Sequence, residues 1–242
     1  MPAIDVVGFD GDDTLWHNET IFSMTQQRFE ALLEPHVAGA VIHERLLATE
    51  RENVAIFGYG IKGFTLSMIE TAIEMTDGRV PADDLRTILE FGKAMLRHPT
   101  ELLDGAREAI EATAAAGHRV ALITKGDLFD QESKLARSGL GELFDAIEIV
   151  SEKDDDRYRR VLRDLDVAPE AFVMVGNSMR SDVLPVVRIG GRAVHVPYHV
   201  TWALEEVDDA DVPADGWWRI DDLSQLADLL SDIVAGAPSS RP

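Results

Sequence analysis

The 242-residue chain contains no cysteine. This absence excludes a disulfide framework, a thiolate nucleophile and a cysteine-ligated metal, and it gives no sign of an oxidising compartment. No apolar stretch approaches the length of about 20 residues that a membrane-spanning helix needs. The N-terminal residues enter a strand-like stretch directly, without the basic and apolar segments of a targeting peptide. We therefore expect a cytoplasmic protein with no membrane partner.

Basic residues are scarce as well. The chain has 23 lysines and arginines against 44 aspartates and glutamates, which gives a formal net charge of −21. Such a chain would repel phosphate backbones, so no nucleic acid partner is expected, and an anionic small molecule would need a local group of cationic side chains. The length allows one large domain or a core with a smaller insertion, and nothing in the sequence indicates an oligomeric state.

Short stretches rich in valine and isoleucine alternate with helical patterns over most of the chain. The expected strands are residues 4–9, 119–124, 146–150, 172–175 and 193–196, with a further short one at 217–220. The helical patterns cover residues 105–116, 127–138, 154–165, 181–189 and 223–233. This alternation predicts the α/β class, with a Rossmann-like doubly wound parallel sheet buried on both faces and right-handed crossovers.

Residues 18–98 break the alternation, because their apolar residues follow a helical spacing throughout. Proline and glycine residues divide this stretch into several helices. We therefore predict an all-helical insertion at residues 18–98 and a core made of residues 1–17 and 99–242.

Polar side chains follow four of the predicted strands, at the edge of an open parallel sheet where ligands bind. They are Asp10, Asp12 and Asp13 after the first strand, Thr124 at the end of the second, Lys153 after the third, and Asn177 and Asp182 after the fourth. Carboxylates as close as those of the first group need a cation or a proton between them. The pattern predicts a metal site, a catalytic site, or both.

Each of these segments also has an ordinary structural interpretation. An Asp-x-Asp after a strand is usually a turn or a helix cap, and residues 124–127 and 176–182 could each be a capped turn. Lys153 precedes three aspartates, as at the solvated start of a helix. The order of the four segments, each at a strand end, favours one shared site over four unrelated turns.

The four segments resemble the ordered motifs of the haloacid dehalogenase (HAD) superfamily. They are residues 9–15 (Phe-Asp-Gly-Asp-Asp-Thr-Leu), 122–127 (Leu-Ile-Thr-Lys-Gly-Asp), 152–154 (Glu-Lys-Asp) and 175–182 (Val-Gly-Asn-Ser-Met-Arg-Ser-Asp). The helical insertion resembles the cap domain that the family's C1 subclass places after the first motif. Haloacid dehalogenases proper lack the second aspartate of the first motif, so Asp12 favours phosphoryl transfer.

The resemblance implies a Mg²⁺-dependent phosphatase acting on a small phosphorylated metabolite. Asp10 would attack phosphorus and form an aspartyl-phosphate, and Asp12 would act as general acid and base. Mg²⁺ takes oxygen ligands and keeps several waters. Its expected ligands are the side chain of Asp10, the backbone carbonyl of Asp12, and Asn177 or Asp182.

The resemblance also implies a group of donors for the phosphoryl oxygens. Lys153 would supply a fixed positive charge and Thr124 a hydroxyl, and both are expected to take part in catalysis. Backbone amides near Gly11, Asp12, Lys125 and Gly126 would complete the phosphate-binding site.

Two positions depart from the family pattern. Asn177 stands where most relatives have aspartate, which predicts weaker Mg²⁺ binding, and Asp13, where glycine is common, is expected to turn outward. Two alternatives stay open. One is a 2-haloacid dehalogenase, in which Asp10 attacks carbon without a metal and against which Asp12 argues. The other is a non-catalytic binding or regulatory module on the same scaffold, which Asn177 keeps open.

Overall fold

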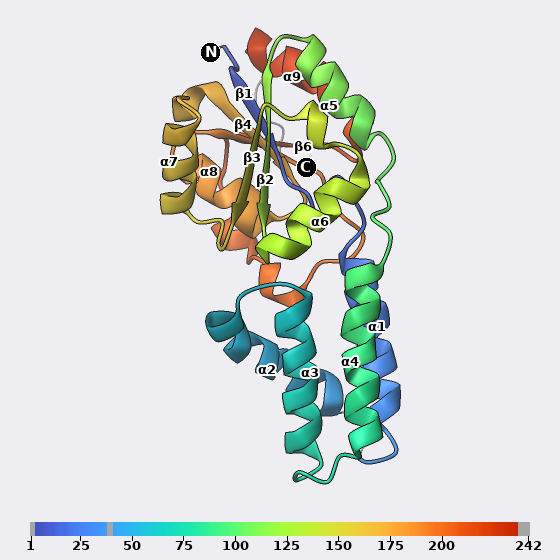
Figure 1. Ribbon diagram of the computed structural model, residues 1–242. Coiled ribbons are helices and arrows are strands. Elements are labelled where there is room, and N and C mark those ends of the chain that lie inside the picture. Colours follow the sequence, from blue (N-terminus) through green and yellow to red (C-terminus); the bar gives the residue numbers. More distant parts are fainter. Residues whose placement is uncertain (1–2, 38–40, 237–242) are drawn as a thin grey trace. The chain divides into compact units, whose positions relative to one another are not determined.

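The computed structural model describes residues 3–37 and 41–236 (Figure 1). The chain divides into two compact units. The core unit comprises residues 1–17, 100–125 and 131–242, and the helical unit comprises residues 18–99 and 126–130. Residues 126–130, which the sequence-based division placed in the core, thus group with the helices of the insertion.

A six-stranded parallel sheet, in the order β3-β2-β1-β4-β5-β6, forms the centre of the core unit (Figure 1). Its strands are β1 (Val6–Phe9), β2 (Arg119–Lys125), β3 (Ala146–Val150), β4 (Phe172–Gly176), β5 (Arg192–His195) and β6 (Trp217–Arg219). β1 pairs with β2 on one side and with β4 on the other. The predicted α/β class with a parallel sheet is confirmed.

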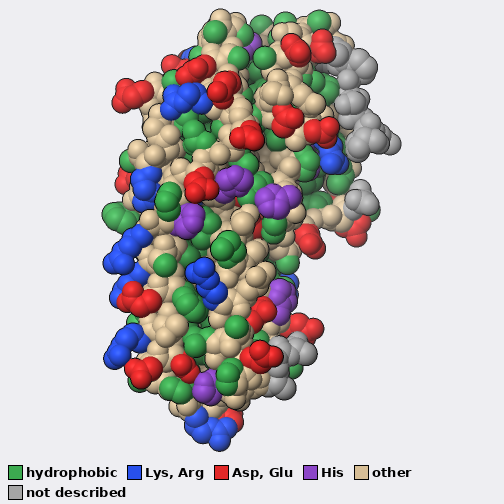
Figure 2. Space-filling view, turned by 90° about the vertical axis from the view of Figure 1, so that its right-hand side faces the viewer, with side chains coloured by type: hydrophobic (Ala, Val, Ile, Leu, Met, Phe, Trp, Pro, Cys, Tyr) green, Lys and Arg blue, Asp and Glu red, His purple; other side chains and the backbone are tan. Residues whose placement is uncertain are grey.

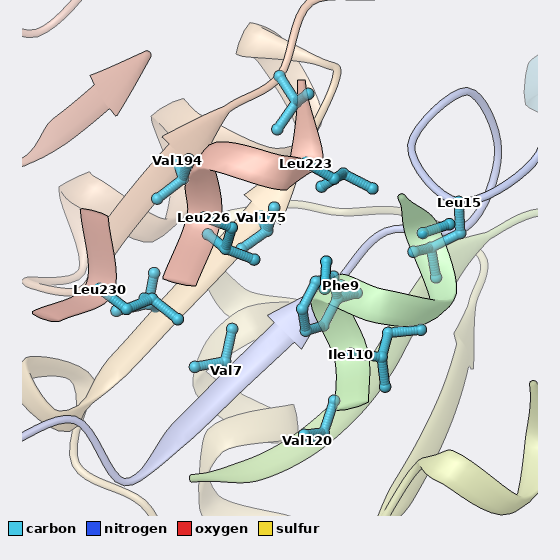
Figure 3. Packing of buried hydrophobic residues seen from close by; sticks show 14 of the residues in the cluster. Val7, Phe9, Leu15, Ile110, Val120, Val175, Val194, Leu223, Leu226 and Leu230 are labelled. Carbon is cyan, nitrogen blue, oxygen red and sulfur yellow. The ribbon is translucent and has the colours of Figure 1, made fainter. Parts of the chain in front are cut away.

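Helices cover both faces of this sheet (Figure 1). One face packs against α5 (Ala106–Ala115), α6 (Leu128–Ser138) and α9 (Leu226–Ala235), and the other against α7 (Asp155–Asp164) and α8 (Leu184–Arg188). Because successive strand residues point to opposite faces, Val7 and Phe9 pack with Ile110 and Leu226 on the first face, and Val6 packs on the second. Figure 3 shows the cluster of buried hydrophobic residues on the first face.

Two predicted helices differ from those in the structure. The segment expected as one helix at 181–189 begins as a π-helical turn, η4 (Met179–Val183), and continues as α8. Pro185 stands in the first turn of α8, where its missing N–H costs no helical hydrogen bond, so a new helix begins there. The last predicted helix starts with a 3₁₀ turn, η7 (Leu223–Gln225), before α9.

The helical unit contains α1 (Glu19–Leu33), α2 (Ile42–Phe57), α3 (Ile61–Met75) and α4 (Ala82–Arg97). Its own apolar core includes Phe29, Phe64, Met68 and Ile88, all buried. Segment 126–130 joins this unit through an ion pair, with Nζ of Lys62 2.8 Å from Oδ1 of Asp127.

The surface mixes side chains of every type. Figure 2 shows acidic, basic and hydrophobic side chains interspersed on one face of the molecule. Within residues 3–37 and 41–236, no helix combines the length and the apolar character that a membrane crossing requires.

Candidate active site

The candidate site lies at the carboxyl end of the sheet, where the strand order reverses. β2 and β3 lie on one side of β1, and β4 begins the other side, so β1 and β4 flank a topological switch point. The chain leaves β1 into Asp10 and β4 into Asn177. The backbone N–H of Asp10 continues the ladder by donating to the carbonyl of Val175 at 2.9 Å.

A buried lysine joins two of the predicted site carboxylates. Lys153, which follows β3, donates through Nζ to Oδ1 of Asp10 at 2.5 Å and to Oδ1 of Asp182 at 2.6 Å. The three side chains are 2%, 9% and 1% exposed, respectively. The structure thus brings together residues that follow β1, β3 and β4.

Burial controls the ionisation of this group. The pKa of Asp10 is raised from 3.8 to about 7, chiefly by burial; the charge of Lys153 opposes this rise, and the carboxylate of Asp182 adds to it. Burial alone would lower the pKa of Lys153, but the charges of Asp10 and Asp182 outweigh burial and raise this pKa above its usual range. One lysine between two buried carboxylates leaves an excess of negative charge, which favours a further cation.

Asp182 has hydrogen bonds on both carboxylate oxygens. Oδ1 accepts from Lys153, and Oδ2 accepts from the backbone N–H of Ser178 at 2.9 Å. The carboxylate lies against the backbone at Gly176, where a Cβ would stand 2.2 Å from Oδ2 of Asp182. Glycine at this position is therefore required by the close approach of Asp182 to β4.

Asn177 is held in place from two sides. Its backbone N–H donates to Oγ1 of Thr14 at 2.9 Å, and its carbonyl lies 2.9 Å from Nε2 of His195. Its side-chain amide faces Oδ2 of Asp10 and the backbone carbonyl of Asp12, with 3.3 and 3.2 Å between the facing atoms. With the amide oxygen toward them, the Asn177 side chain places a third oxygen atom within 3.3 Å of both; with the amide turned over, its nitrogen would donate to both.

The Asp10 carboxylate, the Asp12 backbone carbonyl and the Asn177 side-chain amide form the candidate metal-binding position. Among the residues that the structure describes, no cluster of three or more His, Cys, Asp or Glu side chains could hold an ion. A metal here would therefore need the Asp12 carbonyl and the Asn177 amide beside the Asp10 carboxylate. Of the predicted metal ligands, the structure brings these three together and places Asp182 with Lys153 and Ser178.

The side chain of Asp12 is held by three donors from two segments. Nε1 of Trp16 donates to Oδ1 of Asp12 at 2.6 Å. From α6, Nε2 of Gln131 donates to Oδ2 at 2.9 Å, and Nζ of Lys134 donates to Oδ1 and Oδ2 at 2.9 and 3.0 Å. α6 thus supplies two of the three side chains that hold the Asp12 carboxylate.

The predicted phosphate-binding groups occupy different environments. Oγ1 of Thr124 is buried without a hydrogen-bond partner in the described part of the chain. Gly11 lies so close to Trp16 that a Cβ at this position would stand 2.5 Å from the Trp16 ring. Gly126 adopts a φ of 151°, a conformation that glycine permits. Nζ of Lys125 donates to Oγ of Ser181 at 3.1 Å and lies 2.5 Å from Oε1 of Glu205.

Glu205 connects this lysine to the loop after β4. Oε2 of Glu205 accepts from Oγ of Ser178 at 2.5 Å and from Oγ of Ser181 at 2.6 Å. Burial would raise the pKa of Glu205, but the charge of Lys125 and the hydrogen bonds from Lys125, Ser178 and Ser181 outweigh burial and lower it. The network fixes the loop that carries Asn177 and Asp182.

The expectation that Asp13 turns outward is wrong, because the residue is buried, with 7% of its surface exposed. Its φ of 60° lies in the left-handed region that aspartate tolerates better than most side chains. The turn that brings the Asp13 N–H to the Trp16 carbonyl, at 2.7 Å, places the residue inside the loop.

Reasoning from the sequence missed Gln131, Lys134 and Glu205. Gln131 and Lys134 are three residues apart and so share one face of α6, where a buried polar pair is a signal that helical periodicity could have revealed. Glu205 lies in an acid-rich stretch, and nothing in the sequence distinguishes it from Glu206.

The sequence-family model of the haloacid dehalogenase-like hydrolases matches residues 4–190 of this chain. A haloacid dehalogenase-like family hydrolase from Xanthomonas campestris is 48% identical, with a TM-score of 0.86, over 97% of this chain and 94% of that one. An L-2-haloacid dehalogenase from Xanthobacter autotrophicus shares the fold at 16% identity and a TM-score of 0.64, over 94% of this chain and 98% of that one.

A curated relative carries a more specific name. A glyceraldehyde 3-phosphate phosphatase from Methanothermobacter thermautotrophicus is 34% identical over 119 residues, which are 47% of this chain and 52% of the relative. The chain thus spans about half the length of this relative.

Proposed function

Because the chain belongs to the haloacid dehalogenase-like hydrolases, we propose that it is a Mg²⁺-dependent phosphatase that hydrolyses a small phosphate monoester. The observation that carries the proposal is the position of Asp10. One of its carboxylate oxygens accepts a hydrogen bond from buried Lys153, and the other faces the side-chain amide of Asn177, which also faces the Asp12 carbonyl. Asp10 is thus both a fixed nucleophile and a ligand.

In the first step, a carboxylate oxygen of Asp10 attacks phosphorus. The bond from phosphorus to the leaving oxygen breaks, and that oxygen takes a proton from Asp12. In the second step, water attacks the aspartyl-phosphate and gives a proton to Asp12, the phosphorus bond to Asp10 breaks, and inorganic phosphate forms. Splitting one hydrolysis into two displacements lowers the barrier of each.

The donors for the phosphoryl oxygens are Lys153, the Thr124 hydroxyl and backbone amides near Gly11, Asp12, Lys125 and Gly126. The buried and unsatisfied Oγ1 of Thr124 supports this role, because a buried hydroxyl without a partner costs free energy that a bound phosphate oxygen would recover. Interactions of this kind, aimed at the charge of the transition state, supply most of the rate enhancement in phosphoryl transfer.

The charge of the site supports a divalent cation. Its four carboxylates belong to Asp10, Asp12, Asp182 and Glu205, and its three ammonium groups to Lys125, Lys134 and Lys153. A phosphate dianion would add to this negative excess. Mg²⁺ would be held by Asp10, the Asp12 carbonyl and Asn177, would neutralise the phosphate charge, and prefers such oxygen donors.

Asn177 is the better candidate for a direct ligand than Asp182. Both oxygens of Asp182 already accept hydrogen bonds from Lys153 and Ser178. Asp182 would then act on the metal only through its charge and its hold on Lys153.

The relative named glyceraldehyde 3-phosphate phosphatase makes a three-carbon sugar phosphate the first substrate to test. Its similarity covers about half of each chain, so other small phosphate monoesters belong in the same panel. The dehalogenase alternative shares the fold, and Asp12 argues against it, because attack on carbon with loss of halide needs no acid for the leaving group.

The test measures phosphate release from glyceraldehyde 3-phosphate and other phosphate monoesters, with and without Mg²⁺, and chloride release from a 2-chloro acid. We expect phosphate release that requires Mg²⁺ and is lost in Asp10→Asn. The control is Asp156→Asn, which changes an exposed carboxylate on α7 and should leave the rate unchanged. Metal-independent chloride release would support the dehalogenase, and inactivity on both panels would support the binding module.

A further inference from the structure

We propose that Gln131 and Lys134 are positioning residues that hold the Asp12 carboxylate for the breakdown of the aspartyl-phosphate. This inference rests on the proposed phosphatase function. It assigns a part in the reaction to α6, which lies outside the four motif segments.

The contacts of Asp12 carry the argument. Lys134 reaches both carboxylate oxygens, and Gln131 reaches one of them, at distances of 2.9 to 3.0 Å. Nε2 of Gln131 also donates to the carbonyl of Lys125 at 2.9 Å, so it ties Asp12 to the end of β2. Because donors contact both oxygens, rotation of the carboxylate would break several hydrogen bonds at once.

The burial of these side chains gives a second argument. Gln131 and Lys134 are 2% and 8% exposed, on the face of α6 that also buries Leu135. A lysine and a glutamine on an apolar face cost stability unless they are paired. Both side chains are paired with a proposed catalytic carboxylate, which indicates a functional reason for that cost.

Gln131 has a further unsatisfied group. Its Oε1 is buried and has no hydrogen-bond partner within the described residues. Since Nε2 of the same amide contacts Asp12, this acceptor lies beside the carboxylate that takes a proton from water. It is suited to orient that water by accepting its second hydrogen.

The experiment separates the two steps with p-nitrophenyl phosphate, in the presence of Mg²⁺. Nitrophenolate leaves without a proton, so the first step does not need Asp12 as an acid, whereas the second step needs it as a base. In Lys134→Met and Gln131→Met we expect a burst approaching one nitrophenolate per enzyme. A steady rate about tenfold or more below that of the unmodified protein should follow. Acid-quenched samples should contain more phosphorylated enzyme.

Arg137→Met is the matched control, because it removes a cation from the exposed side of the same helix. It should give the same burst and steady rate as the unmodified protein. Loss of rate in Lys134→Met and Gln131→Met without a burst or trapped phosphoenzyme would overturn the inference, as would unchanged kinetics. Gln131→Met, which removes no charge, decides the matter if Lys134→Met does not fold. Absence of phosphate release from the unmodified protein would instead refute the proposed function.

Discussion

Nζ of Lys153 lies 2.5 Å from Oδ1 of Asp10, and both side chains are almost fully excluded from solvent. The chain separates these residues by 143 positions. The pair depends on Asp182 as well, because the same ammonium group bonds to that carboxylate at 2.6 Å. Loss of the lysine would therefore leave two carboxylates buried without their cation.

Lys153→Met should both destabilise the protein and inactivate it. Removal of one partner from a buried ion pair costs about 3–5 kcal/mol in the free energy of unfolding. Loss of a donor to the transition state should lower kcat by about 100- to 1,000-fold. Urea unfolding and phosphate release measure the two effects. Lys93→Met, which removes an exposed lysine of α4, should change neither; a stable and active Lys153→Met would contradict the role of the pair.

Variants at Asn177 should change the affinity for Mg²⁺ in opposite directions. Asn177→Asp adds a carboxylate charge, worth about 1–4 kcal/mol of attraction, and should tighten binding by about tenfold or more. Asn177→Ala removes the amide oxygen and should weaken binding. Titration calorimetry with Mg²⁺ gives the affinities. Equal affinities for all three proteins would show that residue 177 is no ligand.

The stability of the protein should depend on the ionisation of Glu205. The pKa of Glu205 in the folded protein lies below its ordinary value of 4.5, because Lys125 and two serines outweigh burial. The carboxylate therefore stabilises the fold above about pH 4.5, and this contribution is lost as the pH falls through the lower, folded pKa.

Glu205→Gln should consequently lower the free energy of unfolding by about 1–3 kcal/mol at neutral pH. The difference from the unmodified protein should shrink as the pH falls below 4.5 and through the lower pKa of the folded state. Urea unfolding at several pH values measures this difference. The control is Glu206→Gln, at the exposed neighbouring residue. A difference that does not change with pH would contradict the assignment.

Gly176→Ala should disrupt the loop that holds Asp182. A Cβ at residue 176 would lie 2.2 Å from Oδ2 and 2.3 Å from Cγ of Asp182, so the carboxylate must move. We expect a loss of about 1–3 kcal/mol in stability, together with a reduced kcat because Lys153 loses one anchor. Gly141→Ala, whose Cβ would have its nearest neighbour at 3.9 Å, is the control for both measurements. Equal stability of the two variants would contradict the steric argument.

Local patterns predicted much of the fold. The apolar strands, the helices between them and the helical segment after Asp10 follow from periodicity, and the family resemblance carried by the motifs is confirmed. Pairing of β1 with both β2 and β4 brought the motif residues to one edge of the sheet, as the rule for parallel strands requires. The positions of Lys153 beside Asp10 and of Asn177 beside Asp12 agree with that expectation.

Periodicity did not predict the contacts that hold the side chains of the site. Gln131 and Lys134 lie 119 and 122 positions from Asp12, and Glu205 lies 80 positions from Lys125. Such pairs depend on how a helix or a loop packs against the end of the sheet. The burial of Asp13 depends likewise on the turn that Trp16 closes.

The sequence by itself determined the candidate residues for the proposed chemistry and the strand ends from which they come, because both are local properties of residue type and spacing. Only the tertiary structure decided which partner each charge has. Asp182 bonds to Lys153, Asp12 to Lys134, and Glu205 to Lys125. The physical reason is that burial makes an unpaired charge costly, so the pairing is selected by the packed interior and not by neighbours along the chain.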